Sequence, residues 1–185
     1  ASPIIRMVVV LVTETGLRQH REALSLEWED VDLFNDVIYV KNSKTPAGRR
    51  FVPISDFCKV ELERWARYYG PTVSAYVFPN PRDLSRPLGG FEKTWRSTLK
   101  AAEIPYFPPY NLRHTFATRL NAAGVTDLTI TQLMGHSTPS ILQTYAKAID
   151  EVRRDAVRRL EEFRQSQSEP KVGPREPAFE TQRVN

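Results

Sequence analysis

Cysteine is nearly absent from this chain of 185 residues: Cys58 is the only one, which excludes a disulfide framework and a zinc site built on cysteines. Neither glycine-rich phosphate-binding motif, GxxxxGK[ST] or GxGxxG, occurs, which argues against an enzyme that uses ATP or a dinucleotide. The three histidines lie far apart, and none joins a carboxylate in a metal-binding motif. We therefore expect no metal and no other cofactor.

Long hydrophobic runs are missing as well. The most apolar stretch covers residues 7–12 and follows two isoleucines. It is far shorter than the ~20 residues of a membrane-spanning helix, and no small-residue cleavage site follows it. We expect a buried helix here, in a cytoplasmic protein that makes no membrane contact.

The overall composition is that of a folded protein. Apolar residues make up 41% and charged residues 26% of the chain, close to globular averages, which excludes wholesale disorder. Lys and Arg number 26 against 22 Asp and Glu, so the net charge is +4. This small excess hints at a polyanionic partner and no more.

Three short strand-like runs predict one small antiparallel sheet. They cover residues 31–33, 37–40 and 51–54, and turn-rich segments separate them. The turn between the second and third strands carries Lys44.

The rest of the pattern is helical, so the predicted fold is mainly α with a small three-stranded antiparallel sheet. Apolar periodicity, caps and breaking residues predict helices at about 3–15, 18–26, 56–69, 91–102, 111–123, 126–134, 138–147 and 149–164. Residues 70–87 are predicted to be mostly loop, apart from a short apolar run at 76–78, and residues 104–110 to be extended.

The two ends of the chain differ. The chain enters a core-like helix almost at once, which suggests a piece of a longer protein. Residues 1–164 are predicted to form one domain. Residues 165–185 contain three prolines and little apolar content, and we expect a mobile tail.

Five motifs occur in a fixed order. They are Thr15-Gly16-Leu17-Arg18 with Glu22 downstream, Lys44-Thr45 in a strand–turn–strand ending Arg50-Phe51-Val52-Pro53, Tyr110-Asn111-Leu112-Arg113-His114, Leu133-Met134-Gly135-His136, and Tyr145 nine residues after His136. Each residue alone has an ordinary explanation, such as a surface arginine, a turn lysine, a helix cap or a core tyrosine. Any one motif is a weak signal, but the five together, in this order and at this spacing, are a strong one.

The ordered set closely resembles the catalytic domain of tyrosine recombinases, the phage integrase family, over about residues 4–160. The resemblance implies an integrase-like fold and six catalytic residues: Arg18, Lys44, Tyr110, Arg113, His136 and Tyr145. It also implies metal-free cleavage and rejoining of DNA through a 3′-phosphotyrosyl intermediate, on double-stranded DNA and by a homotetramer bound to two sites. A monomer is possible without DNA.

The residue types also suit that chemistry on their own terms. Cutting a phosphodiester without metal requires cations on the non-bridging oxygens, a nucleophile in line and a proton donor for the leaving oxygen. Guanidinium groups such as those of Arg18 and Arg113 grip phosphate through paired donors. A tyrosine is a competent nucleophile, a lysine on a turn can serve as general acid, and a histidine can hydrogen-bond the phosphate.

Two departures from the family pattern stand out. The commonest form has two residues between arginine and glutamate, but three separate Arg18 from Glu22. We favour Arg18 as the working arginine, because Gly16 and Leu17 precede it as the motif requires, and keep Arg21 in reserve. On a helix, Arg18 and Glu22 are one turn apart and could still meet. Tyr110 stands where the family usually has histidine. His114 is expected to face the interior in a structural role.

Two other functions stay open at this stage. One is a DNA-relaxing enzyme like the type IB topoisomerases, which shares the chemistry without exchanging strands. The other is a catalytically decayed DNA-binding module, in which Tyr110 and the extra residue mark lost activity.

Overall fold

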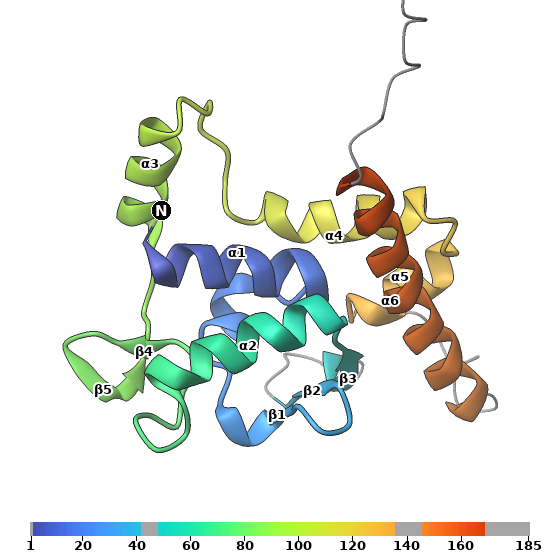
Figure 1. Cartoon of the computed structure of the whole chain (residues 1–185), viewed down its shortest axis with the longest axis horizontal. Helices are drawn as coiled ribbons and strands as arrows, with labels where there is room; N and C mark the ends of the chain where they lie inside the picture. Colours follow the sequence, from blue (N-terminus) through green and yellow to red (C-terminus); the bar gives the residue numbers. More distant parts are fainter. Residues whose placement is uncertain (1, 42–47, 136–145, 169–185) are drawn as a thin grey trace, which may run out of the picture.

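The computed structural model describes residues 2–41, 48–135 and 146–168. In that part of the chain the fold is mainly helical, with one small antiparallel sheet (Figure 1). The predicted fold class is confirmed. No helix within these ranges combines the length and apolar character needed to cross a bilayer.

Helix α1 (Pro3–Thr15) is the central helix of the molecule. Pro3 occupies its first turn, where the missing N–H costs nothing, and Gly16 ends it in the left-handed conformation at φ 64°. Its apolar side chains are buried, and it packs against α2 (Asp56–Tyr69) and α4 (Asn111–Ala122), which lie on either side of it in Figure 1. The predicted bounds of this helix are confirmed.

The three-stranded sheet has the order β1-β2-β3, with β1 at Val31–Asp32, β2 at Val37–Val40 and β3 at Arg50–Pro53. All neighbours are antiparallel, and Ile38 lies opposite Val52. Burial alternates along β2, and Ile38 and Val52 are both fully buried. The predicted sheet is confirmed.

A second, two-stranded sheet lies in a region that was predicted to be loop. Strands β4 (Pro79–Asn80) and β5 (Asp83–Pro87) pair antiparallel across a tight turn, in which the Asn80 side chain accepts from the Arg82 N–H. The strand signal was hidden because β5 is polar and mostly exposed, so its side chains do not alternate in hydrophobicity.

The C-terminal half is built from α3 (Glu92–Ala101), α4, α5 (Asp127–Leu133) and α6 (Ala146–Ser168). A break between residues 147 and 149 was predicted and is wrong: α6 is continuous and runs past 164. No glycine or proline interrupts residues 146–168, so nothing in the sequence forces a break. The rest of the predicted helix 138–147 lies outside the described residues.

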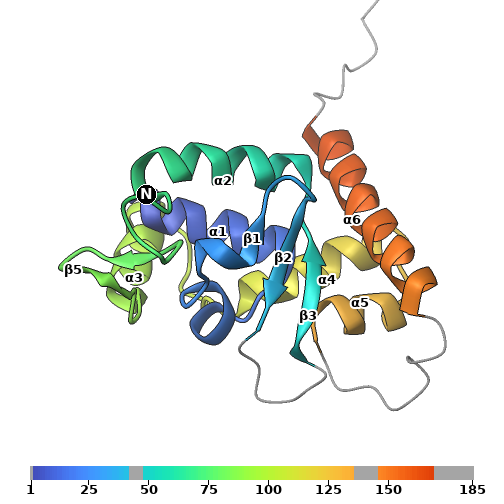
Figure 2. The same cartoon turned by 90° about the horizontal axis from the view of Figure 1, so that it is seen from below.

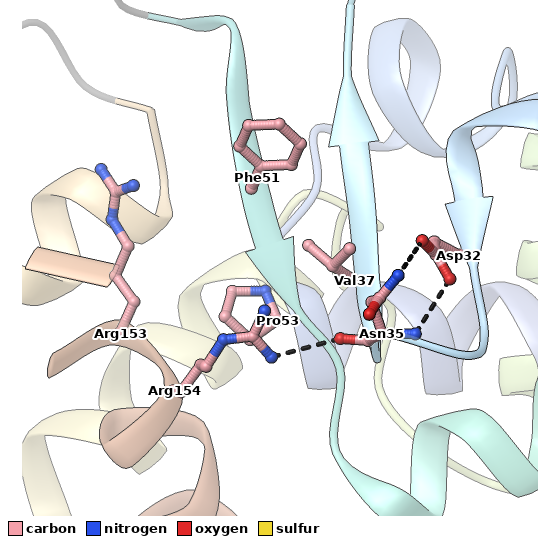
Figure 3. Close-up of a pocket in the computed structure, with 7 residues that line it drawn as sticks. All are labelled: Asp32, Asn35, Val37, Phe51, Pro53, Arg153 and Arg154. Atoms are coloured by element: carbon pink, nitrogen blue, oxygen red, sulfur yellow. Dashed lines mark hydrogen bonds between the residues drawn. The ribbon is translucent and has the colours of Figure 1, made fainter. Parts of the chain in front are cut away.

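Two clusters of buried apolar side chains hold these elements together. The larger one gathers α1, the three-stranded sheet, α2 and α3, and the smaller one gathers α4, α5 and α6. Helix α6 lies at one end of the molecule, beside β3 (Figure 2). There, Arg154 donates from Nη1 to the Asn35 carbonyl over 3.2 Å, beside a pocket of about 320 Å³ (Figure 3).

Candidate active site

The first motif forms a π-helical turn at Gln19–Ala23. The Arg18 carbonyl accepts from the N–H of both Glu22 (2.8 Å) and Ala23 (3.0 Å). This wider turn accommodates one residue more than an α-helical turn. As a result, Arg18 Nη1 lies 2.5 Å from Glu22 Oε1, and the Arg18 N–H donates to Oε2 over 2.9 Å. The expected meeting of Arg18 and Glu22 is confirmed, whereas Arg21 on the same turn is exposed.

Glu22 is buried and binds a second arginine that the sequence analysis did not assign to the site. Arg50, at the start of β3, donates from Nη2 to Oε2 over 2.9 Å and from Nη1 to Oε1 over 3.2 Å. Burial raises the pKa of Glu22, but the hydrogen bonds and charge of Arg50, with those of Arg18, outweigh it and lower the pKa below its ordinary value. Glu22 is therefore ionised at neutral pH.

Arg113 approaches the same carboxylate from α4. Its side chain is only 1% exposed, and Nη1 lies 3.9 Å from Glu22 Oε2. The guanidinium donates to the carbonyls of Gly16 and Met134. Burial and the nearby charge of Arg18 lower the pKa of Arg113 to about 10, with Glu22 opposing them. The side chain thus stays charged at neutral pH in a site that disfavours its charge.

Arg18, Arg50, Arg113 and Glu22, here called the arginine cluster, also hold the end of α5. Three successive carbonyls each accept from one of the arginines. The Leu133 carbonyl accepts from Arg50 Nε over 2.7 Å, that of Met134 from Arg113, and that of Gly135 from Arg18 Nη2 over 3.0 Å. Carbonyls at the end of a helix have no partner within the helix. The arginine cluster provides hydrogen-bond donors for the carbonyl of Leu133, the last residue of α5, and for those of the two residues that follow it.

Two glycines make this close packing possible. Both Gly16 and Gly135 have φ 64°, in the left-handed region. A Cβ atom at Gly16 would lie 2.8 Å from Cε1 of Phe116, and one at Gly135 would lie 2.6 Å from Nη1 of Arg50. The glycines of the first and fourth motifs are therefore explained by backbone conformation and by lack of space.

The charge of the arginine cluster is unbalanced. Three guanidinium groups face one carboxylate, so two positive charges are in excess within these four side chains. Arg18 is the most accessible of the three arginines, with a side chain 34% exposed. Such an arrangement, with one partly exposed arginine and further positive charge buried behind it, favours an anion such as a phosphodiester.

Tyr110 immediately precedes α4 and lies one turn before Arg113, whose N–H donates to the Tyr110 carbonyl over 3.1 Å. It is 47% exposed. The expectation that His114 faces the interior is wrong. His114 is exposed and meets the Tyr110 ring edge-on at 4.9 Å between centroids, because the buried face of α4 carries Leu112 and Phe116 instead.

Three of the six predicted catalytic residues, Lys44, His136 and Tyr145, lie outside the described residues. Their places in the chain still relate them to the arginine cluster. Lys44 belongs to the segment between β2 and β3, His136 directly follows Gly135, and Tyr145 directly precedes α6. Of the predicted residues that the structure describes, Arg18 and Arg113 are brought together, with Tyr110 one turn away.

Arg50 is the residue that the sequence analysis missed. A usable signal was present, because Val52 is an obvious core residue and Arg50 lies two positions before it in a strand. Residues two apart in a strand share a face, and both are indeed buried, while Phe51 between them is exposed. An inward-facing arginine in a strand needs a buried partner, and that partner is Glu22.

Other candidate sites in the described residues are less suited to chemistry. The carboxylates of Glu27, Glu29 and Asp30 lie close enough to share a cation, but the Lys41 ammonium already binds Asp30 and lies 2.7 Å from Glu29 Oε1. The pocket beside α6 in Figure 3 is lined by Asp32, Asn35, Val37, Phe51, Pro53, Arg153 and Arg154. None of these belongs to the arginine cluster.

Sequence comparison identifies the family. The model of the phage integrase family matches residues 3–151, most of the chain, and the chain therefore belongs to this family. The tyrosine recombinase XerC of Staphylococcus saprophyticus is 27% identical over 152 residues, which cover 79% of this chain and 50% of that protein. The tyrosine recombinase XerA of Saccharolobus solfataricus is 29% identical over 157 residues, covering 84% and 50%. The chain spans about half the length of these curated relatives.

Solved structures show the same fold. The integrase from mycobacterium phage Brujita superposes with a TM-score of 0.65 at 24% identity, covering 86% of this chain and 52% of that one. A XerA recombinase superposes with a TM-score of 0.64 at 24% identity, covering 91% and 58%. The Tn1549 transposon integrase in complex with transposon right end DNA gives 0.59 at 25% identity, covering 84% and 58%.

Proposed function

We propose that this chain is the catalytic domain of a site-specific tyrosine recombinase, which cuts and rejoins DNA through a covalent 3′-phosphotyrosyl intermediate. The observation that carries the proposal is the arginine cluster. Residues from the first, second, third and fourth motifs meet there around one buried carboxylate, with positive charge in excess.

In this proposal Arg18 binds a non-bridging oxygen of the scissile phosphate, and the buried Arg113 adds fixed positive charge from the interior of the arginine cluster. The contacts of Arg18 with Glu22 and Gly135 use part of its five-donor guanidinium, and its partly exposed side chain offers the remainder. Positive charge that is fixed before the reaction stabilises the extra charge on the phosphate in the transition state without reorganisation.

The remaining roles follow the motif positions. Tyr145 attacks the phosphorus, the bond to the 5′ oxygen breaks, and Lys44 supplies the proton with which that oxygen leaves. His136 and Tyr110 donate hydrogen bonds to the phosphate. The bond energy is kept in the phosphotyrosine, so a 5′ hydroxyl of another strand can reverse the reaction without ATP.

The proposed partner is double-stranded DNA, with four protomers acting on two sites. The Tn1549 transposon integrase, at 25% identity, was solved with transposon DNA, which supports DNA as the substrate class. Arg and Lys contacts to phosphates release counterions, so binding should weaken as salt rises.

The test uses DNA duplexes with a nick just downstream of a randomised sequence, so that cleavage releases the short fragment that bears the free 5′ hydroxyl and the covalent adduct is trapped. We expect a protein–DNA adduct that survives denaturation, forms in EDTA, and is absent for Tyr145→Phe. Unaltered DNA binding by Tyr145→Phe is the control. If the wild-type protein binds DNA but forms no adduct, the chain is a DNA-binding module instead of a recombinase domain.

A further inference from the structure

Arg50 lies at the centre of the arginine cluster without access to DNA. Its side chain is 2% exposed, and its guanidinium donates four hydrogen bonds to three residues inside the protein. Nε donates to the Leu133 carbonyl over 2.7 Å, Nη1 to the Gly48 carbonyl over 3.0 Å and to Glu22, and Nη2 to Glu22 again. The planar guanidinium is thus used on every side.

These contacts join three segments that carry proposed catalytic residues. Glu22 orients Arg18 through two hydrogen bonds. The Leu133 carbonyl lies three residues before His136, and Gly48 lies four residues after Lys44 in the segment that connects β2 to β3. One buried side chain therefore links Glu22 of the first motif, Gly48 in the connection from β2 to β3, and Leu133 at the end of α5.

We propose that Arg50 is a positioning residue for DNA cleavage: by holding Glu22 and the end of α5 it sets the place and direction of the Arg18 guanidinium. This inference rests on the proposed function. Arg50 touches no reacting atom and acts through Glu22.

The geometry requires arginine at this position. Nη1 and Nη2 of Arg50 each bind one oxygen of Glu22, while Nε donates separately to the Leu133 carbonyl. A lysine keeps the positive charge and much of the side-chain length, but it has a single nitrogen and cannot serve all of these acceptors at once. Arg50→Lys therefore keeps the positive charge but removes part of the hydrogen-bond geometry.

The experiment compares Arg50→Lys with wild type on one nicked duplex, the sequence that the wild-type protein recovers most often from the randomised pool. The rate of adduct formation is measured in single turnover at saturating DNA, together with the DNA concentration that gives half the maximal rate. We expect the maximal rate to fall about 10²-fold, as for other small misplacements of catalytic groups, with little change in the half-saturating concentration. A residue that only supports the fold would not produce this split in a protein that remains folded.

Arg119→Lys is the matched control. Arg119 lies on α4, as Arg113 does, and pairs at 3.4 Å with Glu14, another buried carboxylate, outside the arginine cluster. It should keep the wild-type rate. Thermal unfolding of both variants checks that each is folded at the assay temperature.

A double variant tests whether Arg50 acts through Glu22. If both residues orient Arg18 by one route, Glu22→Gln with Arg50→Lys should be about as slow as the slower single variant, because the two losses are not independent. Losses that multiply would overturn the inference. Should Arg50→Lys fail to fold, Glu22→Asp replaces it: the shorter carboxylate cannot reach both arginines, and a wild-type cleavage rate there would overturn the inference.

The outcomes separate the two proposals. If wild type forms no adduct, the proposed function fails and this inference with it. If wild type forms the adduct and Arg50→Lys reacts at the same maximal rate, the proposed function stands and the positioning role of Arg50 is wrong.

Discussion

Arg18 Nη2 donates to the Gly135 carbonyl over 3.0 Å and so joins two residues that are 117 positions apart in the chain. This contact brings the first motif to the end of α5, directly before His136. The π-helical turn makes the contact possible, because it aims Arg18 back toward the interior despite the additional residue before Glu22. The spacing that departs from the common family form is thus compatible with an assembled site.

Arg18→Ala and Arg21→Ala form a matched pair on one turn. Arg18→Ala should slow adduct formation by about 10²–10³-fold, the usual cost of removing one fixed donor from a transition state. Arg21 is exposed and does not contact Glu22 in the described structure, so its removal should change the rate by no more than about twofold. Single-turnover rates of adduct formation by the two variants are measured on the same nicked duplex. If Arg21→Ala is the slower variant, the catalytic role belongs to Arg21.

Glu22→Gln should destabilise the fold most at neutral pH. The pKa of Glu22 is lowered in the folded state, so its ionisation stabilises the protein above the ordinary glutamate value of 4.5 and this stability is lost as the pH falls through the folded value. Breaking a buried pair costs about 3–5 kcal/mol. The difference in melting temperature between wild type and Glu22→Gln, measured between pH 3 and 7, should therefore narrow below about pH 4.5.

The same comparison contains its own control. Burial raises the pKa of Glu14, so the contribution of Glu14 to stability changes with pH in the opposite direction to that of Glu22. Glu14 is present in both proteins, so its effect cancels when their melting temperatures are subtracted. A gap between wild type and Glu22→Gln that stays constant down to pH 3 would contradict the buried ion pair.

Gly135→Ala should be more damaging than a positive φ angle alone explains. Gly124 also has positive φ, 78°, but a Cβ atom there would meet nothing within 4 Å, so Gly124→Ala isolates the conformational cost of about 1–2 kcal/mol. Gly135→Ala adds the displacement of Arg50. We expect a larger fall in thermal stability together with slower cleavage. Equal effects of the two substitutions would show that Arg50 gives way without consequence.

Variants of Tyr110 test whether a tyrosine, in place of the usual family histidine, slows DNA cleavage. If it supplies one neutral hydrogen bond, Tyr110→Phe should slow cleavage about two- to tenfold, equivalent to ~0.5–1.5 kcal/mol. Tyr110→His should be tolerated, since the side chain is half exposed and imidazole can donate the same bond. A loss above about 10²-fold in the Phe variant is the size expected for general base catalysis and would make Tyr110 a proton acceptor.

Much of the fold follows from local patterns in the sequence. Pro3 at the start and Gly16 at the end bound α1 as predicted, and alternation around Ile38 and Val52 places the sheet. The strands β4 and β5 were missed because their pairing depends on a turn and on backbone hydrogen bonds, which polar, exposed side chains do not reveal.

The site was predictable as a set of motifs but not as a network. Arg18 and Glu22 can be paired from their spacing, since both lie on one turn. The link from Arg50 to Glu22 spans 28 positions and depends on how the sheet packs against the first motif, which no local pattern specifies. His114 was misplaced for a related reason: which face of α4 is buried is decided by α1 and by the smaller apolar cluster.

The central claim is that this chain cuts DNA by covalent attack of Tyr145 on a phosphate held by the arginine cluster. The most direct test is to trap the adduct on the nicked duplex, digest the DNA and then the protein with trypsin, and find by mass spectrometry the peptide that carries the nucleotide remnant. The account predicts the peptide of residues 120–147, in which Tyr145 is the only tyrosine, and predicts no adduct for Tyr145→Phe. A nucleotide remnant on any other peptide, or an adduct that persists in the Phe variant, would contradict it.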